Sequence, residues 1–323
     1  MKKLVFIIPY FGKFNNYFQL FLNSCAKNKE VDWIIYTDDK TLYEYPKNII
    51  VRYTTFNEIK EKIQNKINYD IALERAYKLC DFRPIYGYIF SEEIKEYEYW
   101  GYCDTDMIWG RILEQIGLFL KKDYDKIFFL GHCSVYKNSL ELNKFIETSL
   151  KSNTRFKEVY SREENCSFDE EFKNSINNIF IKNKKTILLK ELEANIYTKS
   201  SNFNITRYDF SQKKYIIKKR KNSFFLYENG KINQYYTENN EIKKEEFLYI
   251  HLQSRKMDVK ISFNEEKYKI IPNAFEKLEY ENIDEKTFYK IKKKNLNLHY
   301  FRLRSKNLKN KIIRFFNRGL KWN

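Results

Sequence analysis

Residues 99–110 of the chain read YWGYCDTDMIWG, an aromatic segment that stops at two aspartates one residue apart and then resumes. In an extended segment residues i and i+2 point to the same side, so the carboxylates of Asp104 and Asp106 can converge at the end of a buried strand. Two converging carboxylates repel each other unless a cation lies between them. A hard divalent cation that keeps open positions for phosphate oxygens fits such a pair. The stretch therefore predicts a metal–diphosphate site, with a solvated turn as the alternative for an isolated D-x-D motif.

The residues around this stretch predict an α/β fold with a mostly parallel central sheet and flanking helices. Continuous apolar runs, typical of strands buried on both faces of a parallel sheet, alternate with helical patterns. The expected strands are residues 3–9, 32–36, 49–53, 99–103 and 126–132, and the expected helices follow residue 17, span 57–77 and begin at 81. Such alternation is typical of βαβ units.

Polar or aromatic clusters follow three of the expected strands. They are Pro9-Tyr10-Phe11, Thr37-Asp38-Asp39 and Asp104-Thr105-Asp106. In parallel α/β sheets, ligands bind beyond the carboxyl ends of the strands. We therefore expect the three clusters to form one binding site.

The C-terminal half has a different pattern. Residues 223–227 and 231–236 flank Asn229-Gly230, a dipeptide typical of a two-residue β-hairpin turn, and residues 247–252 form another short apolar run. This half therefore adds a small hairpin to the α/β domain.

The composition indicates a globular chain in a reducing compartment. Its 323 residues are 43% hydrophobic, enough for a sizeable core, and only 8 Gly and 4 Pro leave little room for linkers. The five cysteines are scattered without a C-x-x-C pair, which argues against a disulfide scaffold or zinc ribbon. The apolar run at residues 4–8 is too short for a signal peptide, and no run reaches the roughly 18 apolar residues of a membrane span. We expect a cytoplasmic protein.

Most of the net charge of +17 lies at the C-terminus. No Asp or Glu follows Glu285, whereas residues 286–323 contain thirteen Lys and Arg and leave +4 for the rest. Apolar residues recur there near helical spacing, which predicts a basic amphipathic helix on an anionic membrane surface. The alternative is a helix packed on the domain with a solvated basic face.

His251 is one of three histidines and precedes Arg255 and Lys256. An imidazole can complete a carboxylate metal site, and Arg and Lys can neutralise diphosphate oxygens. A histidine at a strand end is equally compatible with a hydrogen-bonded core residue.

Two further pairs are candidates for the site. Asp169 or Glu170 can act on an acceptor hydroxyl as general base or hydrogen-bond acceptor, although an acidic run also suits an exposed segment or a helix N-terminus. Asp81 and Arg83 can hold ribose and phosphate, although Asp81 also fits the N-cap of a helix.

Together these motifs resemble the GT-A-fold glycosyltransferases, specifically an uncharacterised bacterial group associated with capsule and lipopolysaccharide synthesis. The resemblance covers about residues 1–260. It rests on the segments IIPYFG at 7–12, TDD at 37–39, CDFRPIYG at 80–87, WGYCDTD at 100–106 and HLQSRKM at 251–257.

The resemblance implies a GT-A-like (Rossmann-like) fold and a set of roles. Asp104 and Asp106 would bind Mn²⁺ or Mg²⁺ on a nucleotide-sugar diphosphate, with His251 as the third protein ligand. The residues implied around the base and ribose are Pro9, Tyr10, Phe11, Thr37 and Asp38, and Asp81 and Arg83 would approach the donor. Residues 98–102, EYWGY, replace the Gly-Gly-Ile-Tyr-like turn of related enzymes, so the donor sugar is not implied.

The expected domain is therefore residues 1–260, with a nucleotide-binding half at about 1–135 and an acceptor side at about 136–260, followed by a basic, largely helical extension at 261–323. The expected function is transfer of a sugar, from a UDP-sugar by preference, to a bacterial surface glycan or a lipid-linked acceptor at the inner face of the cytoplasmic membrane. A sugar-phosphate nucleotidyltransferase is the alternative enzyme, disfavoured because the first loop lacks a Gly-rich, basic phosphate grip. A nucleic-acid-binding protein is disfavoured because the charge is segregated from the strand-end site.

Overall fold

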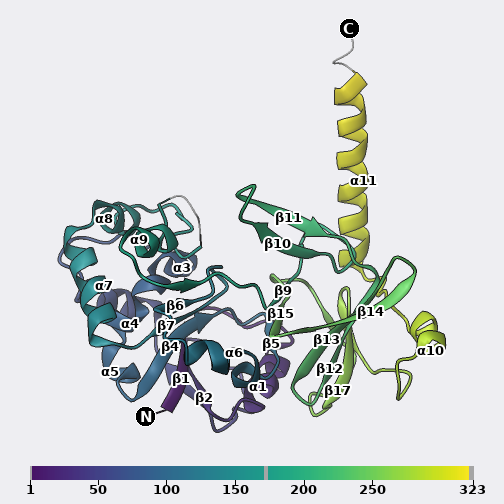
Figure 1. Ribbon diagram of the computed structural model, residues 1–323, viewed down its shortest axis with the longest axis horizontal. Helices are drawn as coiled ribbons and strands as arrows, with labels where there is room; N and C mark the ends of the chain where they lie inside the picture. Colours follow the sequence, from purple (N-terminus) through teal and green to yellow (C-terminus); the bar gives the residue numbers. More distant parts are fainter. Residues whose placement is uncertain (1, 171–173, 320–323) are drawn as a thin grey trace. The chain divides into compact units, whose positions relative to one another are not determined.

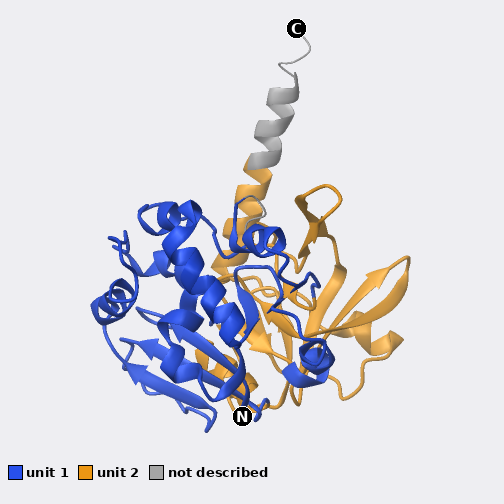
Figure 2. Cartoon of the chain, turned by 60° about the vertical axis from the view of Figure 1, so that its left-hand side comes forward, with its two compact units in different colours: residues 1–14, 28–105, 112–191 blue, residues 15–27, 106–111, 192–323 orange. Residues whose placement is uncertain are grey.

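The computed structural model describes residues 2–170 and 174–319, with side chains described up to residue 309. It shows a mixed α/β protein with two compact units that interrupt each other along the chain (Figure 2). Unit 1 comprises residues 1–14, 28–105 and 112–191, and unit 2 comprises residues 15–27, 106–111 and 192–323. This division differs from the expected boundaries near 135 and 260. Of the predicted basic tail, residues 320–323 lie outside the described residues, as does Glu171 of the acidic run.

Unit 1 is built on a seven-stranded sheet with the order β3-β2-β1-β4-β7-β6-β8 (Figure 1). Its strands are β1 (Lys2–Pro9), β2 (Val31–Thr37), β3 (Ile49–Tyr53), β4 (Tyr97–Cys103), β6 (Lys126–Ile127), β7 (Cys133–Lys137) and β8 (Ile187–Leu188). Strands β3, β2, β1 and β4 run parallel, whereas β7 is antiparallel to both β4 and β6. The sheet is therefore mixed, with its parallel part where the sequence predicted it.

The parallel strands have the burial that their composition predicts. All residues of β2 are buried, and β1 is buried from Leu4 to Ile8, because strands covered on both faces have no solvent side. Helices α2 (Phe56–Gln64) and α7 (Leu140–Ser152) contribute Ile59 and Ile146 to the same hydrophobic core. Unit 1 also contains α6 (Ile112–Leu120), α8 (Thr154–Tyr160) and α9 (Ile176–Lys182).

The segment before β4 forms shorter helices than the helical pattern predicted. Instead of a helix over 57–77, α2 starts at a Thr55–Glu58 capping box and ends at Gln64, whose side-chain amide bonds to the backbone of the following loop. The expected helix from residue 81 is a series of short turns: η1 (Ala76–Lys78), α3 (Leu79–Phe82), η2 (Arg83–Ile85), α4 (Tyr86–Ile89) and α5 (Ser91–Ile94). Gly87 lies against the Trp100 indole, which leaves no space for a side chain there.

The strand expected at 126–132 is also shorter. Strand β6 ends at Ile127 because Phe128 adopts a left-handed conformation, with φ of 69°. Residues 128–132 form a buried turn instead, and β7 follows.

Unit 2 contains helix α1 (Phe18–Ala26) and three sheets. The largest has the order β14-β13-β12-β17-β18-β16, with β12 (Lys221–Glu228), β13 (Lys231–Glu238), β14 (Glu241–Phe247), β16 (Asp258–Val259), β17 (Lys267–Ile271) and β18 (Ala274–Glu276). The predicted hairpin is confirmed: β12 and β13 pair around Asn229 and Gly230, whose φ angles are 50° and 82°. The smaller sheets are β5 (Met107–Trp109), β9 (Ala194–Asn195) and β15 (Tyr249–His251), and the ribbon of β10 (Ile205–Asp209) and β11 (Lys214–Lys218).

Residues 261–276, which the sequence placed in a C-terminal extension, complete the large sheet of unit 2. Strand β17 pairs with β12, because its alternating residues Tyr268 and Ile270 enter the core beside Phe225. Helices α10 (Glu285–Lys290) and α11 (Leu298–Gly319) follow. No helix within the described part of the chain is long and apolar enough to cross a membrane.

Candidate metal centre

The D-x-D segment follows β4 directly, as predicted. The backbone N–H of Asp104 donates to the carbonyl of His132 (2.9 Å), which extends the pairing of β4 with β7 by one residue. The division between the two units falls inside the motif: Thr105 ends a segment of unit 1 and Asp106 begins one of unit 2. The two carboxylates are thus two residues apart on a continuous stretch of chain.

Within unit 2, the pairing of β5 with β15 holds Asp106 and His251 together. His251 pairs with Met107 in this antiparallel ladder, and Leu252 donates its N–H to the Asp106 carbonyl (3.0 Å). As a result, Nε2 of the buried His251 lies 3.3 Å from Oδ1 of Asp106. The other Asp106 oxygen accepts hydrogen bonds from the backbone N–H and hydroxyl of Ser254.

A neighbouring amide determines which histidine nitrogen faces the aspartate. Asn195 is the parallel partner of His251 in the β9–β15 ladder, and its Oδ1 lies 3.1 Å from Nδ1 of the imidazole. Gln253 donates to the same oxygen, which is therefore an acceptor. In the neutral imidazole Nδ1 then carries the proton, and Nε2, which lies 3.3 Å from Asp106, is the nitrogen that can bind a metal.

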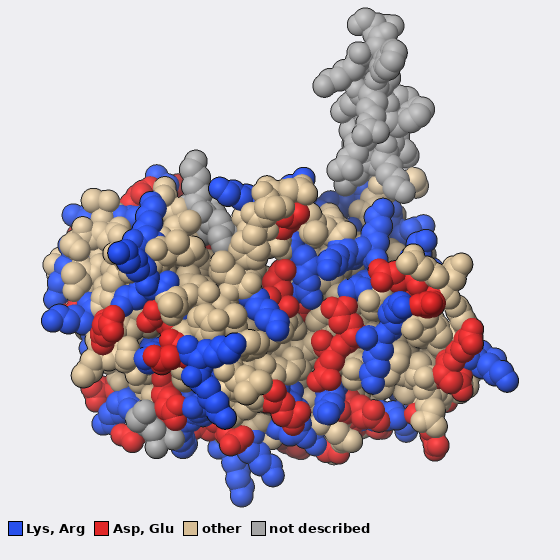
Figure 3. Space-filling view, viewed as in Figure 1, with Lys and Arg blue, Asp and Glu red and all other residues tan. Residues whose placement is uncertain are grey.

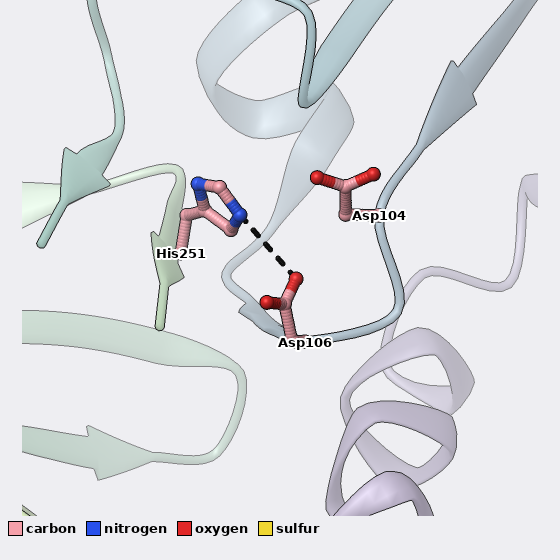
Figure 4. A group of neighbouring side chains, drawn as sticks. All are labelled: Asp104, Asp106 and His251. Atoms are coloured by element: carbon pink, nitrogen blue, oxygen red, sulfur yellow. Dashed lines mark ion pairs between the residues drawn. The ribbon is translucent and has the colours of Figure 1, made fainter. Parts of the chain in front are cut away.

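Figure 4 shows the side chains of Asp104, Asp106 and His251 directed toward one another. One potential ligand atom from each residue lies within 4.8 Å of the others. Two carboxylates and an imidazole form an oxygen-rich donor set that suits Mn²⁺ or Mg²⁺ and leaves positions open for other oxygens. The residues present therefore fit a divalent cation.

The turn after β15 adopts an unusual backbone conformation. Gln253 and Ser254 have φ angles of 51° and 53°, in the left-handed region. For non-glycine residues this conformation costs about 1–2 kcal/mol each. Strain of this kind concentrates at functional sites, and here it accompanies the contact between Ser254 and Asp106.

In unit 1, Arg83 links Asp104 to a buried acid. Its guanidinium forms an ion pair with Asp104, donates to the Gly131 carbonyl (2.5 Å) and lies 3.3 Å from Oδ2 of Asp169. Burial would lower the pKa of Arg83, but the two aspartates hold it well above its usual range. Arg83 is therefore a fixed cation beside Asp104.

Asp169, predicted to be catalytic, is buried beside this arginine. Burial raises its pKa to about 7, with a further contribution from Glu170 and an opposing one from Arg83. Glu170 accepts a hydrogen bond from the N–H of Gly131 (3.0 Å). Both acids thus lie around the turn between β6 and β7.

The strand-end residues of β1 and β2 hold their two loops together. Asp38 is exposed and accepts from the Gly12 N–H (2.7 Å), and the Thr37 hydroxyl accepts from the Asp39 N–H (3.1 Å). Asp39 is buried and pairs with Lys13 (2.6 Å). Burial would raise the pKa of Asp39, but hydrogen bonds from Lys13, Thr41 and the backbone hold it well below its usual range.

Aromatic residues follow the end of β1. Pro9, the last residue of β1, pairs with Tyr36. The ring of Tyr10 stacks on Phe14 (4.5 Å between centroids), and Phe11 meets Phe56 edge-on (5.6 Å). Tyr10 and Phe11 are half-buried and lie at the carboxyl end of β1, beside Asp38 of the β2 loop.

Two predicted donor-binding residues have buried partners instead. Asp81 accepts hydrogen bonds from Lys78 Nζ and from the N–H groups of Cys166 and Phe168, each at 2.9 Å. Arg255 is buried and donates to Asn273 and to the carbonyls of Tyr197 and Ser200. These contacts hold loops together and favour a structural role for both residues over the predicted contact with the donor. Lys256 is exposed.

Sequence reasoning missed the contribution of Asn195 to the site. Asn195 lies in a strand of two residues, too short for any periodicity, and its pairing with His251 links distant parts of the chain. No local sequence signal could have identified it.

A search of curated proteins found no match to this chain. A family of unknown function, DUF6625, matches residues 6–279, a range that includes both aspartates of the D-x-D motif, His251 and Asn195. Because this match spans most of the sequence, the chain belongs to the DUF6625 family.

Proposed function

We propose that this protein is a metal-dependent glycosyltransferase that uses a nucleotide sugar, with UDP as the preferred nucleotide. The observation that carries the proposal is the cluster of Asp104, Asp106 and His251 directly after β4. Such a donor set can bind a divalent cation and still leave room for diphosphate oxygens.

The strand order supports the position of this site. The chain runs outward from β1 to β2 and β3, and then returns to place β4 on the other side of β1. In open α/β sheets, ligands bind at the carboxyl ends of the strands where the order reverses in this way. The loops after β1 and β4 flank that point and carry Tyr10, Phe11 and Asp104. This arrangement is compatible with the proposed GT-A-like fold.

The chemistry follows from where charge develops. Negative charge builds up on the nucleoside diphosphate as the sugar–phosphate bond breaks, and a bound divalent cation supplies electrostatic stabilisation there. Arg83 adds a fixed positive charge beside Asp104. Tyr10, Phe11 and Asp38 are the proposed contacts for the base and ribose.

Asp169 is the proposed base or hydrogen-bond acceptor for the attacking hydroxyl of the acceptor. Its pKa of about 7 allows it to accept a proton near neutral pH, where general bases are most efficient. Glu170 is the second candidate for this role.

The acceptor is proposed to be a surface glycan or a lipid-linked precursor, reached by peripheral attachment to the inner face of the cytoplasmic membrane. Helix α11 supports this part of the proposal, since Leu298, Phe301 and Leu308 are more than half exposed among basic residues. Figure 3 shows Lys and Arg side chains gathered at the foot of this helix.

The decisive experiment is a calorimetric titration of UDP with and without Mn²⁺, on wild type, Asp106→Ala and the exposed control Asp70→Ala. We expect Mn²⁺-dependent binding in wild type and Asp70→Ala, and at least a tenfold loss in Asp106→Ala. A UDP affinity that changes neither on adding Mn²⁺ nor in Asp106→Ala would disprove this assignment of the site. A parallel titration with GDP tests the choice of base.

A further inference from the structure

Strands β10 and β11 of unit 2 form a two-stranded ribbon (Figure 1), and several of its large side chains are exposed. Phe210, Tyr215 and Ile217 are 40%, 48% and 42% exposed, although all three are large and apolar or aromatic. A two-stranded sheet gains little stability by itself. The exposed side chains therefore call for a functional explanation.

The aromatic rings at the turn support one another. Tyr208 pairs with Tyr215 across the ribbon, and its ring meets Tyr215 at 5.2 Å and Phe210 at 5.0 Å between centroids. Tyr215 and Ile217 lie on the same face of β11, because alternate residues of a strand share a face. The result is a preformed apolar patch, the β10–β11 patch, made of Phe210, Tyr215 and Ile217.

Positively charged residues accompany this patch along the chain. Residues 210–227 contain six Lys and Arg and no Asp or Glu. Arg220 pairs with Glu245, and the five lysines are exposed. These lysines are Lys213, Lys214, Lys218, Lys219 and Lys221. Asp209, at the end of β10, accepts hydrogen bonds from Ser211 and Gln212 in the turn.

We infer that the β10–β11 patch and its lysines form a membrane-docking surface for anionic lipid. Tyrosine and other aromatic residues favour the headgroup region, while aliphatic Ile217 gains from leaving water. Each lysine near an anionic surface adds electrostatic attraction to the lipid headgroups. A polyanion such as RNA would use the lysines but would gain little from Ile217, so the combination favours a bilayer.

This surface lies outside the basic tail and extends the proposed membrane attachment to a second element. Helix α11 is tied to the same unit by a hydrogen bond from Asn307 to the Lys199 carbonyl (2.8 Å), six residues before β10 begins. The inference does not depend on sugar transfer.

The test is flotation of the full-length protein with vesicles of phosphatidylcholine, with and without phosphatidylglycerol. We expect Phe210→Ser/Tyr215→Ser to weaken binding to the anionic vesicles about tenfold, corresponding to about 1.4 kcal/mol. Replacing Lys213, Lys214, Lys218 and Lys219 by Gln should weaken it at least as much. The matched control is Leu42→Ser/Tyr53→Ser, which removes two exposed apolar side chains from unit 1 and should bind like wild type.

A second measurement reports directly on the β10–β11 ribbon. Compared with wild type, whose own tryptophans include Trp322 of the tail, Phe210→Trp should gain fluorescence that brominated lipids quench, whereas the fluorescence gained in Tyr53→Trp should not be quenched. The inference would be overturned if brominated lipids did not quench the added tryptophan of Phe210→Trp, or if the control and patch variants lost vesicle binding equally. It would also be overturned if the patch and lysine variants bound RNA less well than wild type but floated with the vesicles like wild type. Mn²⁺-dependent UDP binding, measured on the same variants, should stay at the wild-type level, which separates this inference from the proposed activity.

Discussion

Nε2 of His251 lies 3.3 Å from Oδ1 of Asp106, and the two residues are held by adjacent strands of one sheet. The ladder between β5 and β15 sets this distance, and the Asn195 amide orients the imidazole. A site supported by paired strands keeps its geometry better than one carried on loops alone. The proposed metal binding therefore depends on the positions of Asp106, His251 and Asn195.

Removing a metal-site carboxylate should abolish stabilisation by metal. A ligand that binds only the folded state stabilises it by about 2.7 kcal/mol at one hundred times its Kd. We expect Mn²⁺ to raise the Tm of wild type and of the exposed control Asp70→Asn, but not that of Asp106→Asn. Differential scanning fluorimetry with and without EDTA measures this. An equal rise in Asp106→Asn would place the metal elsewhere.

Asn195 should matter for metal affinity without contacting the metal. Its replacement by Leu keeps a similar volume but leaves Nδ1 of His251 without its acceptor, so the imidazole loses its fixed orientation. Loss of such an outer partner typically costs 10–100-fold in metal affinity. Mn²⁺ titration of Asn195→Leu should show this loss. Asn204→Leu, a substitution of the same type in unit 2, should keep wild-type affinity.

The sequence alone predicted the parallel half of the sheet because its strands are continuous apolar runs. Strand β3 spans Ile49–Tyr53, the residues that the pattern indicated, and the hairpin at Asn229-Gly230 follows from local turn chemistry. The helix expected over 57–77 was wrong beyond residue 64, because Gln64 bonds to the backbone of the following loop. That contact opposes the local helical pattern.

At the candidate site, too, features set by local sequence were predictable and features set by distant contacts were not. The spacing of Asp104 and Asp106 is local and predicted their convergence, and the strand-end position of His251 added the third residue. Most partners of Asp81 and Arg255 are backbone groups distant in sequence, which no motif encodes. A charged residue in a motif can therefore serve the fold, and only its surroundings tell the two roles apart.

Asp81 should prove to be a structural residue. It is fully buried and bonded to Lys78 and to two backbone N–H groups, so Asp81→Asn leaves a buried lysine without its counter-ion. Breaking a buried pair in this way costs about 3–5 kcal/mol. Urea unfolding should show this loss. A stable Asp81→Asn protein with weakened UDP binding would instead favour the donor-binding role.

Asp169 should make stability fall as the pH rises toward neutral. Because burial raises its pKa from 3.8 to about 7, the folded protein keeps a proton that the unfolded chain has lost between these values. The unfolding free energy therefore decreases with pH across this window, by at most about 1.4 kcal/mol per unit. Asp169→Asn should remove this slope in urea titrations between pH 4.5 and 7.5. Parallel wild-type and variant profiles would contradict the assignment.

A methyl group at Gly131 should disturb Asp169 through its packing. A Cβ built at Gly131 would lie 2.7 Å from Oδ2 of Asp169, a distance that real side chains do not show. The carboxylate must therefore shift, and overpacking of this kind costs about 1–3 kcal/mol. We expect Gly131→Ala to lower stability by that amount and to flatten the pH profile attributed to Asp169.

Gly117→Ala is the matched control for this substitution. Gly117 lies in helix α6 with no atom within 4 Å of an added Cβ, so the same methyl group should raise stability by about 0.5–1 kcal/mol through helix propensity. Opposite signs for the two Gly→Ala variants in urea unfolding would show that the effect at Gly131 comes from the Asp169 carboxylate. If Gly131→Ala also stabilised the protein, Asp169 would be free to move, and its position beside Arg83 would not be required by the fold.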